Sequence, residues 1–255
     1  VVSNVALSQD IEATLRCLEE LGAEFAIDGS TAAVRGMGAN PMSPLRRMAY
    51  PHLNCGESGS TLRFLIPVAL AVRGGGIFTG RGRLMERPLT PYFDLFDEKG
   101  LFHESKGGAL TVTGALTPGE YRLPGDVSSQ FVTGLLYALP LLEGDSEIVL
   151  TTPLESRGYV DMTAEALGQF GVRVEARENG FFIPGGQLYR PRSLTVEGDW
   201  SQAGFWFAAV SLGAQLDVRG MKLPSVQGDW RFLDLLEQMH GAAEAELDVS
   251  QYPDL

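Results

Sequence analysis

The sequence predicts an α/β (α+β) fold built from repeated βαβαββ subdomains, and three observations support this prediction. Three short loops combine glycine with hydroxyl or acidic side chains, and each leads into a long apolar segment of helical character. A second series of glycines closes amphipathic helices at a similar interval. Short β-branched or alternating runs lie between these landmarks, so each period holds about two helices and several strands.

The three loops recur at a nearly fixed interval. They occupy residues 56–61 (GESGST), 125–130 (GDVSSQ) and 198–202 (GDWSQ), and their first glycines are 69 (56 to 125) and 73 (125 to 198) residues apart. A glycine-rich turn that opens a helix leaves several backbone N–H groups pointing at one spot, and hydroxyl groups add further donors. The loops therefore predict binding sites for small anions such as a phosphate or a carboxylate.

The amphipathic helices are expected to end at glycines in the left-handed cap conformation. Gly22, Gly100, Gly171 and Gly241 each follow a segment in which apolar residues recur every three or four positions. Strands are predicted where β-branched or alternating runs are bounded by turn residues. These runs are residues 77–79, 110–112, 147–150, 172–175, 194–196 and 216–218.

Composition narrows the class of protein. The formal net charge of −12 argues against nucleic acid binding, which needs a basic face. The apolar run at residues 64–72 is too short to span a membrane. Cys17 and Cys55 form no disulfide framework and fit a reducing cytoplasm. The three histidines have no cysteine or carboxylate at ligand spacing, so no metal site is predicted.

Anion binding by an acidic chain requires positive charge close to the loops. Seventeen of the twenty basic residues are arginine, and Arg63, Arg83, Arg87 and Arg157 stand beside the loops or their partner loops. Exposed charges are screened beyond about 8 Å in physiological salt, so a local cluster can outweigh a distant negative background. Guanidinium groups also bind carboxylate and phosphate in a bidentate manner.

These residues also fit a purely structural interpretation. Ser128 and Ser129 are suitable N-cap residues for the helix that follows them. Arg83 and Arg87 fit a solvated helix face or a pair with Glu86. The residues alone leave both interpretations open.

Five segments together resemble the 5-enolpyruvylshikimate-3-phosphate synthase family of enolpyruvyl transferases. They are residues 55–63 (CGESGSTLR), 82–88 (GRLMERP), 125–130 (GDVSSQ), 156–161 (SRGYVD) and 227–229 (QGD). Their order and spacing match the family along essentially the whole chain. One such motif is a weak signal, whereas five in register are specific.

The resemblance implies a two-domain enolpyruvyl transferase fold, each domain made of three βαβαββ copies, with the active site between the domains. Residues 1–196 would form the first domain, on the shikimate 3-phosphate side, and residues 197–255 one repeat of an incomplete second domain. The implied activity transfers the enolpyruvyl group from phosphoenolpyruvate to the 5-hydroxyl of shikimate 3-phosphate, releasing phosphate in aromatic amino acid biosynthesis. It implies a cytoplasmic monomer with these two small-molecule substrates, without cofactor, metal, nucleic acid or membrane partner.

The resemblance also assigns residues to the shikimate 3-phosphate site. Serine hydroxyls would hold its phosphate, a glutamine would lie over its ring, and an arginine and a tyrosine would line the pocket. The residues at these motif positions are Ser128, Ser129, Ser156, Gln130, Arg157 and Tyr159.

The phosphoenolpyruvate site is assigned in the same way. Gly59 would allow this substrate to approach the backbone closely, and Arg87, given a catalytic role, would grip its anionic groups. Ser60, Arg63 and Arg83 are the further binding residues at this site. A separate Pro-Asp step near the end of the chain matches the family and makes Asp254 the candidate general base.

The sequence departs from the family pattern in several places. The family's Lys-Ser motif near the start, and a later segment with lysine, glutamate and arginine, have no counterpart here. The chain therefore looks truncated at both ends and is expected to bind substrates better than it catalyses. Glu57 stands where many relatives have asparagine, so a carboxylate adjoins the expected anion site.

Two alternatives remain beside this synthase. The related enolpyruvyl transferase that acts on UDP-N-acetylglucosamine shares the fold but uses a reactive cysteine on a mobile loop, and residues 83–89 contain no cysteine. The other alternative is a non-catalytic or inactive fragment that binds only shikimate 3-phosphate.

Overall fold

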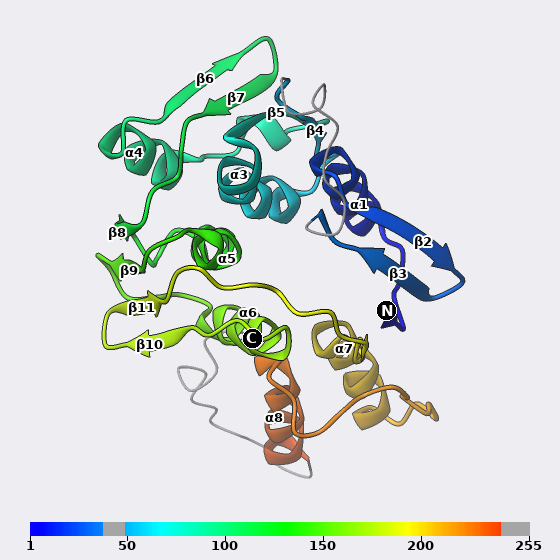
Figure 1. Cartoon of the computed structure of the whole chain (residues 1–255). Coiled ribbons are helices and arrows are strands. Elements are labelled where there is room, and N and C mark those ends of the chain that lie inside the picture. Colours follow the sequence, from blue (N-terminus) through cyan, green and yellow to red (C-terminus); the bar gives the residue numbers. More distant parts are fainter. Residues whose placement is uncertain (38–48, 241–255) are drawn as a thin grey trace.

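The structure is a computed structural model that describes residues 1–37 and 49–240 of the 255-residue chain (Figure 1). It is a mixed α/β structure, as predicted. Its strands are β1 (Val2–Ser3), β2 (Glu24–Asp28), β3 (Thr31–Arg35), β4 (His52–Asn54), β5 (Gly75–Thr79), β6 (Phe102–Lys106), β7 (Ala109–Thr113), β8 (Gly119–Leu123), β9 (Ser146–Leu150), β10 (Glu175–Arg177), β11 (Gly180–Ile183) and β12 (Leu194–Thr195). Its α-helices are α1 (Gln9–Leu21), α3 (Gly59–Arg73), α4 (Thr90–Glu98), α5 (Ser129–Ala138), α6 (Arg157–Gln169), α7 (Trp200–Ser211) and α8 (Phe232–Met239). Short 3₁₀ helices are η2 (Leu84–Glu86), η3 (Leu139–Leu141) and η4 (Gly228–Arg231).

Two successive parts of the chain have the same topology. The order β4-α3-β5-α4-β6-β7 forms a sheet with strand order β4-β5-β7-β6, in which only β4 and β5 are parallel. The order β8-α5-β9-α6-β10-β11 forms a sheet β10-β11-β9-β8, in which only β8 and β9 are parallel. Both are βαβαββ units with the first, second, fourth and third strands adjacent, which is the unit that the sequence predicts.

The remaining sheet is assembled from two distant parts of the chain. Strands β1, β2 and β3 come from the beginning, and β12 pairs in parallel with β1, placing Val2 opposite Leu194. The order β12-β1-β3-β2 repeats the arrangement of the other two sheets. The chain therefore returns after β11 to complete its first sheet (Figure 1).

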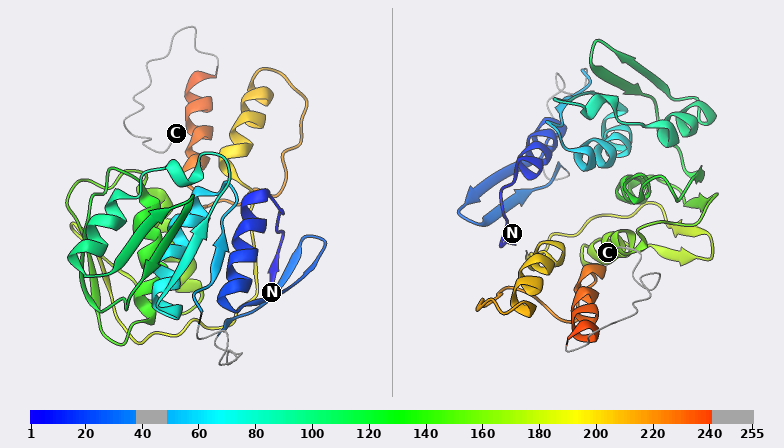
Figure 2. Two further views of the ribbon diagram at one scale, coloured as in Figure 1. Left: turned by 90° about the horizontal axis from the view of Figure 1, so that it is seen from above. Right: turned by 180° about the vertical axis from the view of Figure 1, so that it is seen from behind.

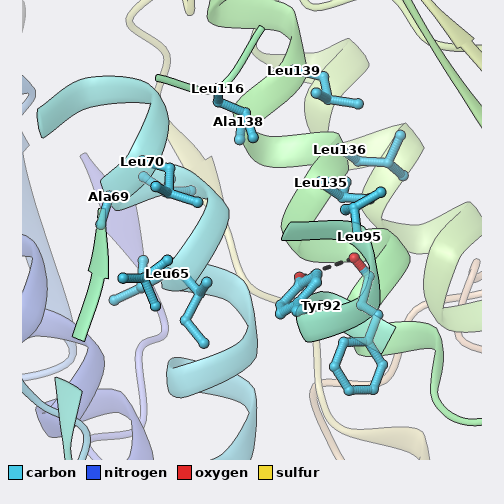
Figure 3. Packing of buried hydrophobic residues seen from close by; sticks show 14 of the residues in the cluster. Leu65, Ala69, Leu70, Tyr92, Leu95, Leu116, Leu135, Leu136, Ala138 and Leu139 are labelled. Carbon is cyan, nitrogen blue, oxygen red and sulfur yellow. Dashed lines mark hydrogen bonds between the residues drawn. The ribbon is translucent and has the colours of Figure 1, made fainter. Parts of the chain in front are cut away.

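Helices α3 and α5 pack side by side in the interior (Figures 1 and 2). Glycine permits this approach, because a Cβ on Gly134 of α5 would come within 2.5 Å of the Arg63 carbonyl oxygen of α3. Tyr92 of α4 is fully buried, and its hydroxyl donates to the carbonyl oxygens of Arg63 and Phe131 at 2.9 and 3.0 Å. Figure 3 shows Tyr92 among the buried leucines of this core. One side chain thus joins three helices.

The glycine caps agree with the prediction where the structure describes them. Gly22 ends α1 with φ 116°, and Gly100 and Gly171 follow α4 and α6 with φ 66° and 80°. Gly241 lies outside the described residues.

Four of the six predicted strands are confirmed: residues 77–79 lie in β5, residues 110–112 in β7, residues 147–150 in β9, and Leu194 and Thr195 form β12.

Two predicted strands are wrong in whole or in part. The strand expected at residues 172–175 begins only at Glu175, because the Val172 N–H bonds back to α6 and the Arg173 N–H bonds to the Gln187 side chain. Residues 216–218 form no strand. Leu216 is half exposed, and among the described residues no strand lies beside it to supply ladder bonds.

Helices α7 and α8 project from one side of the rest of the structure (Figure 2). Helix α7 is apolar but carries exposed aromatic side chains, Phe205 at 73% and Trp206 at 59% exposure. Across the described ranges, every helix is too short or too polar to cross a membrane.

Candidate active site

The first loop lies at the carboxyl edge of a parallel strand pair. Asn54 and Thr79 pair at the ends of β4 and β5, so the first loop (residues 56–61) and the loop of residues 80–89 leave from one edge. Loops at the carboxyl ends of parallel strands are the usual place for ligand binding in α/β sheets.

Glycines allow these two loops to pack closely. The Arg81 N–H donates to the Gly56 carbonyl oxygen at 2.6 Å, and a Cβ on Gly80 would lie only 3.1 Å from that oxygen. The carboxyl carbon of Glu57 lies 3.2 Å from the position of a Cβ on Gly82. The carboxylate that departs from the family pattern therefore faces the backbone of the second of these loops.

Helix α3 begins beneath an arginine. Ser58 is its N-cap, and its hydroxyl accepts a hydrogen bond from the Thr61 N–H at 3.2 Å. Gly59 is the first helical residue, and a Cβ there would lie 2.5 Å from Nη1 of Arg87. Any larger residue would displace this guanidinium group, which stands over the positive end of the helix dipole.

Arg63 connects the first loop to the second loop (residues 125–130). Its guanidinium donates to Oε1 of Gln130 at 2.7 Å and lies 5.1 Å from the centre of the Phe131 ring. Its backbone carbonyl is held by Tyr92. The Arg63 side chain is thus held by α5 and its backbone by α4, and Gln130 is brought to the first loop.

Arg63 and Arg87 form a concentration of positive charge. Burial lowers the pKa of Arg63, and the neighbouring charge of Arg87 lowers it further. Within residues 1–37 and 49–240, no carboxylate lies at ion-pair distance from either guanidinium. Two adjacent cations without a carboxylate partner repel each other, and a bound anion would relieve that repulsion.

The second loop is tied to the loop of residues 151–156. β8 and β9 are parallel and end together, so these loops also leave from one edge. Oγ1 of Thr152 accepts hydrogen bonds from the N–H groups of Gly125 and Asp126 at 2.9 and 3.2 Å. The Glu155 N–H donates to the Gly125 carbonyl at 3.0 Å, which places Ser156 beside the second loop.

Ser128 is the N-cap of α5, as its structural interpretation predicts. Its Oγ accepts a hydrogen bond from the Gln130 N–H at 3.3 Å. Capping uses only a lone pair, so the hydroxyl proton stays available to a ligand. Ser129 is 8% exposed and begins the helix. The capping and binding interpretations are therefore compatible.

Ser156 has an unusual backbone conformation. It precedes α6 with φ 53° and ψ 45°, the left-handed region, and its side chain makes no capping bond. Non-glycine residues in this region are strained, and such strain is found preferentially at functional sites. The residue is thus held in place by its loop, with its hydroxyl unused by the helix.

Arg157 and Tyr159 belong to the first turn of α6. Arg157 lines an open hollow of about 440 Å³ together with residues 150–154 and the turn between β10 and β11, and its Nε lies 3.6 Å from the Asp161 carboxylate. Tyr159 is 43% exposed. Both side chains are accessible beside the second loop.

Of the other predicted residues, Arg83 stands apart from this arrangement, whereas Ser60 lies next to Gly59 at the start of α3. The Arg83 side chain is 90% exposed and pairs with Glu86 at 3.1 Å, as its structural interpretation predicts, and none of its described contacts reaches Arg63 or Arg87. The Ser60 hydroxyl lies 3.2 Å from that of Ser58. Asp254 lies outside the described residues.

The third loop (residues 198–202) is filled by the protein itself. Asp199 caps α7 by accepting from the Gln202 N–H at 3.0 Å, and Oε1 of Gln227 accepts from the Trp200 N–H at 2.9 Å. Nε2 of Gln227 donates to Glu197 and to the Gly198 carbonyl at 2.7 and 2.9 Å. The long-range hydrogen bonds around the third loop link it to residues 197 and 220–227. None of the described hydrogen bonds of the third loop reaches the first two loops.

Sequence reasoning missed three residues that organise the site: Tyr92, Thr152 and Thr14. Thr152 follows a strand at the same edge as the second loop, which is a detectable signal. Tyr92 and Thr14 lie inside amphipathic helices, where nothing in the pattern separates them from ordinary core residues. In the described ranges, no three His, Cys, Asp or Glu side chains gather as metal ligands would.

The fold and the candidate site define a class: an α/β protein of repeated βαβαββ units with paired loops and clustered arginines at the carboxyl edges of its parallel strands. The chain belongs to the family described as EPSP synthase (3-phosphoshikimate 1-carboxyvinyltransferase), whose family model matches residues 1–253.

Individual relatives agree with this assignment. The chain is 41% identical over 272 residues to the 3-phosphoshikimate 1-carboxyvinyltransferase of Clostridium kluyveri, covering 100% of this chain and 62% of that protein. It is 42% identical over 247 residues to the protein of the same name from Clostridium beijerinckii, covering 93% and 56%. The chain thus spans about three fifths of the length of the curated relatives it matches.

A solved structure has the same fold. The EPSP synthase of Acinetobacter baumannii superimposes with a TM-score of 0.73 at 23% identity, covering 93% of this chain and 53% of that one.

Proposed function

We propose that the chain belongs to an enzyme that transfers the enolpyruvyl group of phosphoenolpyruvate to the 5-hydroxyl of shikimate 3-phosphate and releases phosphate, in aromatic amino acid biosynthesis. Family membership supports this reaction. The observation that carries it is the Arg63 side chain, which lies beside Arg87 and contacts Gln130 at 2.7 Å. This contact joins the two loops for which anion binding is proposed, as a reaction between two anionic substrates requires.

Phosphoenolpyruvate is proposed to bind at the first loop. Its phosphate and carboxylate would be neutralised by Arg87 and Arg63, with Ser60 as a further donor. The 2.5 Å separation between Arg87 and a Cβ position on Gly59 supports a role for Gly59 in backbone approach. Arg83 is proposed as a peripheral residue of the same site, its charge shared with Glu86.

Shikimate 3-phosphate is proposed to bind at the second loop. Ser128 and Ser129 would hold its phosphate, with Ser156 assisting from the adjoining loop. The unused hydroxyl of Ser156 and its strained backbone support that role. The ring would lie between Gln130 and the α6 residues Arg157 and Tyr159, next to the hollow that Arg157 lines.

The reaction consists of proton transfers, an addition and an elimination, and the protein has to stabilise the charges that these steps create. A proton reaches the methylene carbon of phosphoenolpyruvate, and the 5-hydroxyl adds to the adjacent carbon and loses its proton. The tetrahedral intermediate then loses a proton from its new methyl group as it expels phosphate, which restores the double bond. These steps balance without a metal or an organic cofactor. Arginines and helix N-termini would stabilise the charge that develops on the leaving phosphate. Asp254 is the proposed general base.

We further propose a division into a first domain of residues 1–196 and one repeat of a second domain at residues 197–255. The parallel pairing of β12 with β1 supports the boundary, because it makes residues 194–195 part of the first sheet. A cytoplasmic monomer is proposed as well, and the two free thiols of Cys17 and Cys55 fit that compartment.

Titration calorimetry with shikimate 3-phosphate tests the proposal. The double variant Ser128→Ala, Ser129→Ala removes two hydrogen bonds to a charged group, each contributing about 1.5 to 3 kcal/mol. We expect the Kd to rise at least tenfold, since about 1.4 kcal/mol is a factor of ten. Ser201→Ala is the matched control, because Ser201 holds the same position in the third loop, and its Kd is expected to stay unchanged.

Two further measurements separate the alternatives. Ser128→Asp keeps an N-cap but adds negative charge, so it should abolish phosphate binding while preserving the melting temperature. Phosphate release on adding phosphoenolpyruvate to the wild-type chain with shikimate 3-phosphate would establish catalysis. Binding without release would leave only the shikimate 3-phosphate site, and heat with UDP-N-acetylglucosamine alone would reject the proposal.

A further inference from the structure

Four hydroxyl groups form a continuous chain from helix α1 to the start of α3. The Thr14 and Thr61 hydroxyls are 2.7 Å apart, Thr61 donates to Ser58 at 2.8 Å, and Ser58 and Ser60 are 3.2 Å apart. Thr61 and Ser58 are each 1% exposed, so bulk water does not reach the middle of this chain. Its last member, Ser60, is partly exposed next to Gly59.

The positions of the protons in this chain follow from counting donors. Each hydroxyl carries one proton and two lone pairs. Thr61 donates to Ser58 at 2.8 Å and also lies 3.5 Å from the Asp10 carbonyl oxygen, a longer and weaker contact. With the Thr61 proton directed to Ser58, the 2.7 Å contact between Thr14 and Thr61 uses the Thr14 proton. Thr14 also lies 3.0 Å from the Asp10 carbonyl oxygen, a second acceptor for the same proton.

The lone pairs of Ser58 decide the direction of the last link. Ser58 accepts from the Thr61 N–H at 3.2 Å and from the Thr61 hydroxyl at 2.8 Å. Both lone pairs are then occupied, so Ser58 can only donate to Ser60, and Ser60 cannot donate back. The proton of Ser60 is left to point away from the chain.

The free proton of Ser60 is next to the positive site. Gly59 precedes Ser60 and lies directly under Arg87, and Arg63 follows one turn later on the same helix. A chain of hydroxyls aligned in one direction also polarises its terminal donor, which strengthens a hydrogen bond to an anion.

We infer that Thr61 is a positioning residue: by occupying the Ser58 lone pair, it keeps the Ser60 hydroxyl turned outward as a donor to an anion held by Arg87 and Gly59. The identity of that anion, phosphoenolpyruvate, rests on the proposed function. The role of Thr61 in orienting Ser60 rests on the hydroxyl contacts alone. Without the Thr61 hydroxyl, Ser58 has a vacant acceptor site, and Ser60 turns inward to donate to it.

Three variants of the full chain test this role. Thr61→Val removes the hydroxyl and keeps the shape, and Thr61→Ser restores the hydroxyl. Thr133→Val is the matched control, because Thr133 is 3% exposed and its hydroxyl lies 3.2 Å from that of Thr163, away from the first loop. All three are first compared by melting temperature to measure any general loss of stability.

The readout is anion affinity, measured by calorimetry with phosphoenolpyruvate in saturating shikimate 3-phosphate and separately with inorganic phosphate. We expect Thr61→Val to raise the Kd for phosphoenolpyruvate at least about tenfold, the lower end of the range for one lost hydrogen bond to a charged group. Thr61→Ser should restore it to within about twofold, and Thr133→Val should leave it unchanged. The Kd for shikimate 3-phosphate should not change in any variant.

The outcomes keep the two proposals distinct. If the wild-type chain binds inorganic phosphate but neither substrate, the proposed function fails, and the phosphate Kd of Thr61→Val still decides the inference. Equal affinities for wild type and Thr61→Val, or equal losses in Thr61→Val and Thr133→Val, would overturn the inference. It is also overturned if the wild-type chain binds no anion at all.

Discussion

Helices α3 and α7 begin with closely similar sequence signals and end in different environments. Each follows a glycine loop, each has a capping side chain at its start, and each continues into an apolar segment. At α3 the helix start faces Arg87 and Arg63, which have no described carboxylate partner. At α7 the Trp200 N–H already donates a hydrogen bond to the Gln227 side chain. A helix N-terminus is therefore open to an anion only when the protein leaves its donors free.

The two helices also differ in how they are buried. Nine residues of α3 are buried, among them Leu62, Leu65 and Ile66, whereas in α7 only Trp200 and Ala203 are. The α3 helix packs against α5 in the interior, while α7 exposes Phe205 and Trp206. An apolar sequence thus permits burial, and the position of the helix in the topology determines it.

The largest effect is expected from filling the space between α3 and α5. A Cβ introduced by Gly134→Ala would overlap the Tyr92 hydroxyl and the Arg63 carbonyl oxygen. Overpacking of this kind costs about 3 kcal/mol, the upper part of the usual range. Urea unfolding should show a lower midpoint with an unchanged slope. An unaffected midpoint would mean that the interior contact does not distinguish α3 from α7.

The second prediction concerns the ligand-facing end of α3. Gly59→Ala places a Cβ 2.5 Å from Nη1 of Arg87 and should displace that guanidinium. We expect the affinity for phosphoenolpyruvate, measured by calorimetry with shikimate 3-phosphate present, to fall at least about tenfold. Shikimate 3-phosphate itself should bind as before.

Gly204→Ala in α7 is the control for this substitution. A Cβ there would meet only the Phe232 ring at 3.4 Å, which is ordinary contact. Its affinity for both substrates should equal that of the wild type. A loss of affinity in the control as large as in Gly59→Ala would remove the contrast between the two helix starts.

The third prediction uses the buried tyrosine beside α3. Burial raises the pKa of Tyr92 well above its ordinary value, whereas in the unfolded chain it titrates near about 10. Above that pH the folded state keeps a proton that the unfolded state loses, so the free energy of unfolding should fall as pH rises. The slope from this residue approaches about 1.4 kcal/mol per pH unit.

Alkaline unfolding curves of the wild type and Tyr92→Phe test this prediction. The variant also loses two hydrogen bonds, so only the pH slopes are compared. Its slope should be smaller between about pH 10 and 11. Identical slopes in the two proteins would show that Tyr92 ionises in the folded state.

The smallest effect is expected at the start of α7. Gln227→Ala removes the acceptor of the Trp200 N–H and the donor to the Gly198 carbonyl. The free energy of unfolding should fall by about 1 kcal/mol, because these groups are partly solvent-accessible and water replaces the lost partner. Calorimetry with both substrates should show unchanged affinities. Weaker binding in this variant would place the third loop in the site after all.

Much of the fold was predictable because it depends on local physics. The glycine caps at Gly22 and Gly171 and the N-caps at Ser58 and Ser128 follow from backbone conformation and hydrogen-bonding chemistry within a few residues. The repeat interval also predicted repeated βαβαββ units, and the described residues contain two of them in continuous chain order. The strand expected at residues 216–218 was wrong because alternation alone supplies no partner strand.

The candidate site was predictable in its residue types and less so in its contacts. The sequence pointed to Arg63, Arg87 and Gln130 separately, but their meeting depends on the packing of α3 against α5. The filling of the third loop by Gln227 depends on a contact 27 residues away in the chain. Such long-range contacts leave no periodic signal.

The parallel pairing of β1 with β12 has a consequence for biosynthesis. Val2 is opposite Leu194, so 192 residues (2 to 194) must be added after β1 before its parallel neighbour β12 exists. At about 5 to 20 residues per second, the delay is on the order of 10 to 40 s. During that time the nascent polypeptide on the ribosome carries an uncovered strand edge that other chains can join.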